Sequence, residues 1–241
     1  GYKGLHLDET LQVFASIYQY DYDGYQDELQ QFDPIRGAGA NFVSNADGIT
    51  NTGFEIELYY AATDRLTLSG NFSYTETEYG EDYFVFTVDD PINPVPVFGT
   101  FTQGFVSAQV TDPSQASDYT VNLKGGPLKG IPEEKATIRV SYEQDTRFGP
   151  LYYLLSHSYT GDFSASGIQR PLDRIDSRET TNLNISWYSQ DGNLSLRAYV
   201  DNLFDNDNYY ALSTGDHETN YRKSVTALPP RVMGLDIRYR F

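Results

Sequence analysis

The 241-residue sequence contains no cysteine, only one methionine and one tryptophan, and only three histidines. Without cysteine, disulfide bonds and thiolate metal ligands are excluded. The histidines, His6, His157 and His217, lack the spacing of a metal site, so neither a metal nor another cofactor is expected. No glycine-rich phosphate loop, GxSxG or HExxH motif is present either, and we therefore do not expect an enzyme.

Basic residues are also scarce, since 17 Lys and Arg stand against 34 Asp and Glu, for a formal net charge of −17. Binding to nucleic acid requires a basic surface, so a nucleic-acid partner is not expected. The sequence has no run of about eighteen apolar residues of the kind that forms a transmembrane helix. A membrane-spanning helix is therefore not expected.

Aromatic and turn-forming residues are abundant, with 21 Tyr, 14 Phe and 20 Gly. Apolar and polar residues alternate with a period of two, which is typical of strands that bury one face. We predict nine strands, at residues 1–7, 10–22, 50–61, 65–76, 134–144, 150–160, 180–189, 193–203 and 231–241. The strands at 10–22 and 150–160 carry tyrosines on both faces, so the sequence leaves their register open.

Short and long connections alternate between these strands. The short ones are 8–9, 62–64, 145–149 and 190–192, and the long ones are 23–49, 77–133, 161–179 and 204–230. A membrane barrel has short turns at one end and long loops at the other, whereas a soluble sandwich has no reason for this alternation. The pattern predicts an all-β, antiparallel transmembrane β-barrel, with a soluble β-sandwich as the alternative.

The charged residues of the best-patterned strands all fall on the polar face. A basic side chain on the lipid face would cost about 2–4 kcal/mol at the bilayer midplane, so we predict that these charges face the barrel lumen. Among them are Glu55, Glu57, Arg139, Arg197, Asp201, Asp236 and Arg238. Glu55 and Glu57 lie about 7 Å apart along one face, close to a glycosidase spacing, but paired charges are ordinary on a lumen wall.

The outward face ends in aromatic residues on the strands that run toward the short turns, at Tyr60, Tyr142, Trp187 and Phe241. Such residues form a girdle at a membrane interface. The final strand repeats the pattern, with Met233, Leu235, Ile237, Tyr239 and Phe241 on one side and polar residues on the other. A terminal segment so regular is expected to lie in a sheet.

Two segments near the end of the sequence carry a family resemblance. SLRAYVDNLFDNDNYY (195–210) followed by PPRVMGLDIRYRF (229–241) resembles the C-terminal end of TonB-dependent outer-membrane receptors. TGFEIELYYAATDRLTLSGNFSYTETEY (52–79) and GIPEEKATIRVSY (130–142) resemble other parts of the same barrels. The resemblance implies a barrel of about 22 strands in the outer membrane, plugged by an N-terminal domain. Residues 1–241 are then expected to be its C-terminal portion, with the plug, the TonB box and the earlier strands missing.

The resemblance also implies partners and a function. Such a receptor imports a scarce nutrient, such as a ferric siderophore, cobalamin or an oligosaccharide, with energy delivered by the TonB system through the N-terminal region. The outer-membrane assembly machinery is expected to read Phe241, Tyr239, Ile237, Leu235 and Met233 as an assembly signal. Outer-membrane lipid and an unidentified small-molecule ligand are the other expected partners. The alternative from another class is a soluble carbohydrate-binding sandwich or a secreted carbohydrate-active enzyme.

The long segments hold most of the acidic excess, which is consistent either with solvated loops or with an acidic vestibule that attracts cations. The segment 77–133 includes an apolar, proline-broken run, FVFTVDDPINPVPVFGTF (84–101). Two interpretations stay open for it: a hairpin that extends the barrel wall, or a lid in which Tyr83, Phe84 and Phe86 contact the ligand. Asp205, Asp207 and Asn208 resemble the start of a calcium loop, but its glycine and closing glutamate are missing.

Overall fold

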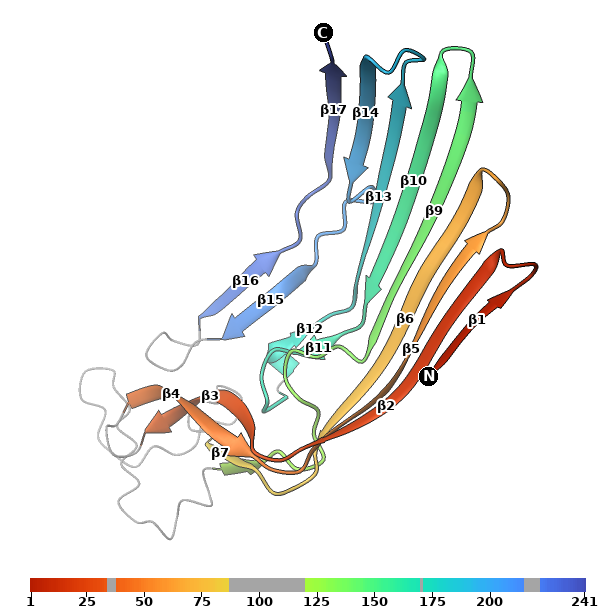
Figure 1. Cartoon of the computed structure of the whole chain (residues 1–241). Helices are drawn as coiled ribbons and strands as arrows, with labels where there is room; N and C mark the ends of the chain where they lie inside the picture. The colour runs from red at the N-terminus through yellow and green to blue at the C-terminus, as the bar shows by residue number, and fades with distance from the viewer. Residues whose placement is uncertain (34–37, 87–119, 170, 215–221) are drawn as a thin grey trace, which may run out of the picture.

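The computed structural model describes residues 1–33, 38–86, 120–169, 171–214 and 222–241. Its central element is a single antiparallel sheet in the order β1-β2-β5-β6-β9-β10-β13-β14-β17 (Figure 1). The strands are β1 (Tyr2–His6), β2 (Leu11–Tyr22), β5 (Ile49–Ala61), β6 (Leu66–Tyr79), β9 (Glu134–Thr146), β10 (Gly149–Thr160), β13 (Arg178–Tyr188), β14 (Leu194–Asp201) and β17 (Val232–Tyr239). These are the nine strands that the period-two pattern predicts. Within the described residues, β1 and β17 form the two edges of the sheet.

Each long connection contains a two-stranded antiparallel pair of its own, and we call these pairs hairpins. The hairpins are β3 (Tyr25–Asp33) with β4 (Ala38–Ala46), β7 (Phe84–Phe86) with β8 (Thr120–Asn122), β11 (Phe163–Ser164) with β12 (Arg174–Ile175), and β15 (Tyr209–Thr214) with β16 (Lys223–Ala227). Between β11 and β12 lies one 3-10 turn, η2 (Pro171–Asp173). The hairpins gather at one end of the sheet and the tight turns at the other (Figure 1). The predicted division into a short-turn end and a long-loop end is thus confirmed.

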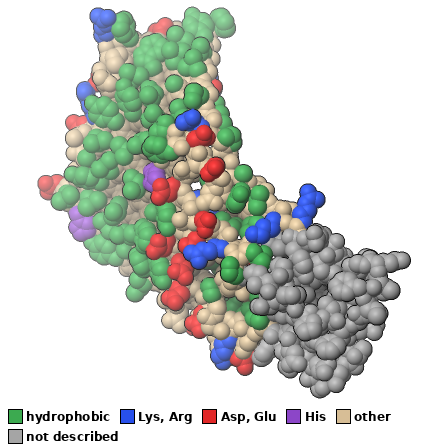
Figure 2. Space-filling view, turned by 180° about the vertical axis from the view of Figure 1, so that it is seen from behind, with side chains coloured by type: hydrophobic (Ala, Val, Ile, Leu, Met, Phe, Trp, Pro, Cys, Tyr) green, Lys and Arg blue, Asp and Glu red, His purple; other side chains and the backbone are tan. Residues whose placement is uncertain are grey.

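The pairing register separates an apolar face from a polar face. Phe54 of β5 stands opposite Ile17 of β2 and Tyr74 of β6. Its neighbour Glu55 stands opposite two serines, Ser16 and Ser73, on the other face. No other described element covers the apolar face: Ile17 is 83% exposed, and Figure 2 shows hydrophobic side chains spread over the sheet. A soluble sandwich would bury this face under a second sheet, whereas a membrane protein presents it to lipid.

The two strands whose register the sequence left open follow the same rule. In β2, Val13 pairs with Leu58 on the apolar face, so Tyr18 and Tyr20 fall on the polar face. In β10, Leu155 pairs with Val140 and with Leu183, which places its odd-numbered residues on the apolar face. These include His157, whose Nδ1 lies 2.8 Å from the Thr181 hydroxyl. Pairing with neighbouring strands therefore decides the register that tyrosines on both faces had obscured.

No helix of the described residues is long and apolar enough to cross a membrane. The main buried core of these residues lies instead where β5 and β6 meet the hairpins, and we call it the loop-base cluster. It consists of Ala46, Ile49, Tyr79, Leu123 and Leu128, with Tyr25, Tyr83, Val121, Ile131 and Ile168 packed against it. It joins the bases of the β3–β4 and β7–β8 hairpins to the ends of β5 and β6.

Candidate functional site

The seven charged residues predicted to face the lumen share one face of the sheet. Their cross-strand partners are mostly polar: Glu55 lies between Ser16 and Ser73, Glu57 between Phe14 and Asn71, Arg139 between Ser69 and Ser156, Asp201 opposite Val232, and Arg238 opposite Ser195. Arg197 and Asp236 face each other directly, with Nη1 and Oδ2 3.7 Å apart. This face is therefore suited to contact water or a polar occupant, and the lumen assignment stays a prediction.

Arg197 illustrates how such a side chain is held. Its Nε donates a hydrogen bond of 3.1 Å to Asn184 Oδ1, and its guanidinium lies 4.9 Å from the centre of the Tyr199 ring. The side chains of Arg197 and Asp236 are 52% and 62% exposed. Ion pairs this exposed contribute little to stability, about 0–1 kcal/mol. The main contribution of these two side chains is therefore to make this face of the sheet polar, not to stabilise the fold.

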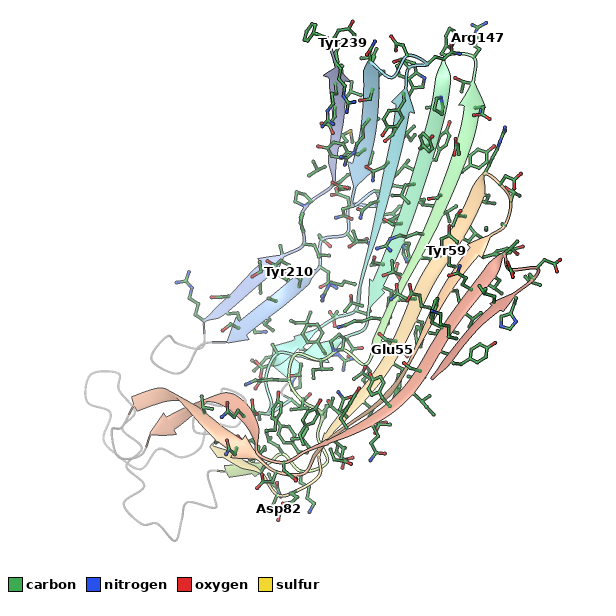
Figure 3. The ribbon with its side chains drawn as sticks, viewed as in Figure 1. Glu55, Tyr59, Asp82, Arg147, Tyr210 and Tyr239 are labelled. Atoms are coloured by element: carbon green, nitrogen blue, oxygen red, sulfur yellow. The ribbon has the colours of Figure 1, made fainter. Side chains whose placement is uncertain are left out.

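Glu55 and Glu57 line an open hollow of about 670 Å³ together with Lys3, Phe14 and Asn71. Figure 3 shows Glu55 and Tyr59 along β5, with Asp82 at the hairpin end and Tyr239 and Arg147 at the short-turn end. Lys3 Nζ lies 5.1 Å from the centre of the Phe14 ring. The hollow offers both charge signs and the aromatic ring of Phe14, which suits contact with a polar partner.

A buried carboxylate lies within the loop base. Asp27 of β3 is 3% exposed, and its carboxylate accepts a hydrogen bond of 2.7 Å from the Tyr79 hydroxyl and forms an ion pair of 3.0 Å with Lys129 Nζ. Burial, and after it the hydrogen bond to Asp27, raise the pKa of Tyr79 well above its ordinary value. The sequence gives no signal for this group, because Asp27 lies in an unremarkable polar run. The contacts join the β3–β4 hairpin to the end of β6.

Tyr83, a predicted ligand contact, packs in the same cluster. Its ring stacks on that of Tyr79 with a centroid distance of 5.4 Å, and its hydroxyl is hydrogen-bonded to Ser44. Burial raises the pKa of Tyr83. Phe84 and Phe86 belong to β7, which pairs with β8, so the base of a hairpin is present. Their side chains, and residues 87–119 on which the lid interpretation depends, lie outside the described residues.

A second hollow, which we call the rim cavity, lies at the hairpin end of β9 and β10. It measures about 500 Å³. Three stretches of the chain supply most of its lining: 127–134 before and at the start of β9, 159–164 at the end of β10 and after it, and Gln169 with 171–174 before and at the start of β12. Thr77 of β6 also lines it. Its lining includes Glu133, Glu134, Tyr159, Phe163, Gln169 and Arg174. Sequence reasoning missed it, because the three segments come together only through the pairing of β9 with β10.

The NLFD motif at 202–205 is the centre of a group of hydrogen bonds, which we call the Asn202 cluster. Asn202 is 4% exposed, and its side-chain amide donates to the carbonyl oxygens of Asn206 (2.8 Å) and Pro229 (3.0 Å). Its Oδ1 accepts a bond of 3.0 Å from the Asn206 amide. Asp205 Oδ1 accepts a bond of 2.8 Å from the backbone amide of Arg231. The motif thereby fixes the path from β14 to β17.

The calcium-loop similarity of the same segment has a structural explanation. Asp205 is engaged with Arg231, and the Asn208 side chain donates to the Ser177 carbonyl oxygen at 2.7 Å. In the described part of the chain, no group of three His, Asp or Glu side chains could hold a metal ion. Both residues therefore serve to hold the loop in place.

The predicted assembly-signal residues lie along the edge strand β17 and the end that follows it. Met233, Leu235, Ile237 and Tyr239 are each more than half exposed on the apolar face. The rings of Tyr239 and Phe241 meet edge to face, with a centroid distance of 5.1 Å. The outward aromatics Tyr60, Tyr142 and Trp187 share this apolar face, since each pairs with a leucine of a neighbouring strand. Recognition of the signal by assembly machinery stays a prediction.

An uncovered apolar face, a polar opposite face and hairpins confined to one end define the wall of an outer-membrane β-barrel. The family model for the TonB-dependent receptor-like β-barrel matches residues 1–203. The chain belongs to this family of receptors and is an outer-membrane protein. No curated protein sequence gives a significant match.

Solved structures show the same fold. The ferric yersiniabactin uptake receptor FyuA of Yersinia pestis aligns with a TM-score of 0.67 and 16% identity, over 98% of this chain and 28% of that one. The siderophore receptor PiuA of Acinetobacter baumannii aligns at 0.64 and 15%, over 98% and 27%. The copper transporter OprC aligns at 0.61 and 15%, over 97% and 30%. The chain thus spans less than a third of the length of these proteins, and their names cover different cargoes.

Proposed function

We propose that residues 1–241 form the C-terminal part of the barrel of a TonB-dependent transporter that takes up a scarce nutrient. A ferric siderophore, cobalamin and an oligosaccharide are the candidate classes. The family match over residues 1–203, on a sheet with one lipid-type face and one polar face, is the observation that carries the proposal. Structural neighbours named as ferric siderophore and copper carriers support import of a metal complex, but identities of 15–16% leave the ligand open.

The partners follow from the same assignment. Outer-membrane lipid contacts the apolar face, and the TonB system supplies energy through the remainder of the full-length receptor. The assembly machinery recognises the β17 edge with Met233, Leu235, Ile237, Tyr239 and Phe241. The polar face, with Glu55, Glu57, Arg139, Arg197, Asp201, Asp236 and Arg238, lines the transport path. The loop that contains Tyr83, Phe84 and Phe86 is proposed to contact the ligand.

The soluble alternative requires a second layer on the apolar face. In the described residues the four smaller sheets are two-stranded hairpins, and Ile17, Met233 and Ile237 are 66–83% exposed. Exposed apolar area on this scale is unfavourable in water. A sandwich or secreted enzyme is therefore the weaker candidate.

The test is growth of a strain that lacks the full-length gene. On single iron sources, cobalamin or glycans, it should fail on one nutrient, and a plasmid copy should restore growth only when TonB is present. Normal growth on all of them would oppose the transport proposal. So would a full-length product that is soluble without detergent and absent from outer-membrane fractions.

A further inference from the structure

We propose that the rim cavity binds a saccharide ring, with Phe163 as the stacking surface and Glu133, Glu134 and Gln169 as hydrogen-bonding groups. The site is separate from the polar face of the sheet and does not depend on which nutrient the receptor imports. Its volume of about 500 Å³ lies within the range of about 300–1,000 Å³ that small-molecule sites occupy.

Hydrogen bonds between the lining segments hold the walls of the cavity in place. The Gly161 amide donates to the Glu134 carbonyl oxygen and the Gly130 amide to that of Ser164, both at 2.8 Å. Gln169 Nε2 donates to the Pro127 carbonyl oxygen at 3.0 Å. Gln169 has a φ of 61°, a conformation that a non-glycine residue adopts only where its surroundings impose it. The cavity is therefore preformed, and a ligand would lose little affinity in ordering it.

The aromatic part of the lining is also rigid. Phe163 pairs with Ile175, which is 1% exposed, and the Arg178 guanidinium lies 5.7 Å from the centre of the Phe163 ring. Within the described residues, Arg178 Nη1 is buried without a hydrogen-bond partner, and the Phe163 ring is one of the groups that the guanidinium faces. An aromatic face is negative, and it attracts the C–H groups on one side of a sugar ring. Phe163, with Tyr159 nearby in the lining, supplies such a face.

The polar part of the lining selects against other ligands. Three carboxylates, those of Glu133, Glu134 and Asp162, stand against one guanidinium, that of Arg174, so an anion is disfavoured. Arg174 already pairs with Asp162 at 2.7 Å. The side chains of Glu133 and Glu134 are exposed, and within the described residues neither carboxylate has an ion-pair partner, so both can accept hydrogen bonds. Hydroxyl groups donate to carboxylates in strong, charge-assisted bonds, and a polyhydroxylated ring satisfies both groups.

Two sources could supply this ring at the hairpin end of a barrel in the outer membrane. One is the saccharide of a lipid-linked glycan in the surrounding leaflet, and the other is a free oligosaccharide. Both present the same chemistry to the cavity, so the probes have to separate them.

The experiment uses the full-length receptor purified in detergent. The two probes are maltotriose and the core oligosaccharide released from the host's lipopolysaccharide, and affinities are measured by calorimetry with saturation-transfer NMR to identify the contacting protons. Phe163→Ala should weaken binding about tenfold, which corresponds to 1.4 kcal/mol. Glu134→Gln should weaken it about threefold, through loss of one charge-assisted bond. Because the bond from Gly161 uses the Glu134 backbone, this second variant keeps the wall intact.

Matched controls are available at the opposite end of the molecule. Phe148→Ala removes an exposed ring from the β9–β10 turn, and Glu9→Gln removes a charge from the β1–β2 turn. Both should bind the probes within twofold of wild type. Binding of the core oligosaccharide alone would assign the site to membrane glycan, and binding of maltotriose alone would assign it to free sugar.

Two outcomes would overturn the proposal: neither probe binds the wild-type receptor, or both Phe163→Ala and Glu134→Gln bind as wild type does. If Phe163→Ala fails to assemble, Glu134→Gln decides. Nutrient-dependent growth is scored separately, so a failed saccharide site leaves the transport proposal standing, and loss of transport leaves the saccharide result interpretable.

Discussion

Asn202 provides the sharpest test of how this barrel wall is held together, because it combines a buried amide with an unusual backbone. Its φ is 52°, in the left-handed region, where asparagine is tolerated and alanine is strained. Its side chain makes three hydrogen bonds, two to carbonyl oxygens and one from the Asn206 amide. Replacement by alanine therefore removes three bonds and adds backbone strain at one position.

The magnitude follows from these two contributions. Three bonds at about 0.5–1.5 kcal/mol each come to about 1.5–4.5 kcal/mol. The left-handed backbone adds about 1–2 kcal/mol for a residue with a Cβ. Asn202→Ala should thus lower the free energy of unfolding by about 2.5–6.5 kcal/mol, whereas Asn202→Gly, which tolerates this φ, loses only the hydrogen-bond part.

The assay is urea unfolding of the full-length receptor refolded into lipid vesicles, followed by the fluorescence of its tryptophans and by heat-modifiable mobility on gels. The expected order of stability is wild type, then Asn202→Gly, then Asn202→Ala. Exposed Asn193 in the β13–β14 turn is the control site, and Asn193→Ala should cost less than either. If Asn202→Ala unfolds at the wild-type urea concentration, or proves more stable than Asn202→Gly, the Asn202 cluster does not stabilise the fold as proposed.

Three further predictions concern the terminal residue, the lipid face and the loop base. Deleting Phe241 from the full-length protein should reduce the outer-membrane level more than ligand affinity, as measured by immunoblotting of membrane fractions; normal levels would leave the residue as an interfacial anchor only. Leu235→Arg places a charge on the outward face and should destabilise the inserted barrel by about 2–4 kcal/mol, while Asn71→Arg on the polar face should cost much less, by urea titration in vesicles. Because the folded pKa of Tyr79 is raised, its stabilisation of the loop base is complete below about pH 10 and should be lost as the pH rises above that value. Proteolysis of the β3–β4 hairpin should accordingly increase at high pH in the wild type, and Tyr79→Phe should show a weaker pH dependence.

The wall strands could be predicted from the sequence because each one has apolar side chains on the face toward lipid and polar side chains on the other face. Residues such as Leu235 and Asp236 can alternate only if the side chains of the strand point to two different media. The hairpins β3–β4 and β11–β12 gave no such signal. They extend past the sheet, and contacts such as that of Asp27 with Tyr79, 52 residues apart, hold them in place.

The functional surfaces divide in the same way. The shared face of Glu55, Arg139 and Arg197 follows from alternation alone once the strands are in register. The rim cavity does not, because Glu134 and Phe163 lie far apart in the sequence and meet only after β9 pairs with β10. Asn202 lies between these two cases. The sequence singled it out as part of the NLFD motif, but its hydrogen bond to the Pro229 carbonyl oxygen is evident only in the folded chain.

By itself, the amino-acid sequence determined the strand count, the two faces and the alternation of short and long connections, because these depend on the local period of the side chains and on the solvent each face meets. The tertiary structure decided the register of β2 and β10, the loop-base cluster, the Asn202 cluster and the rim cavity. Each of these joins residues from separate segments, and their proximity depends on which strands pair and in what register, information that no local pattern of side chains contains.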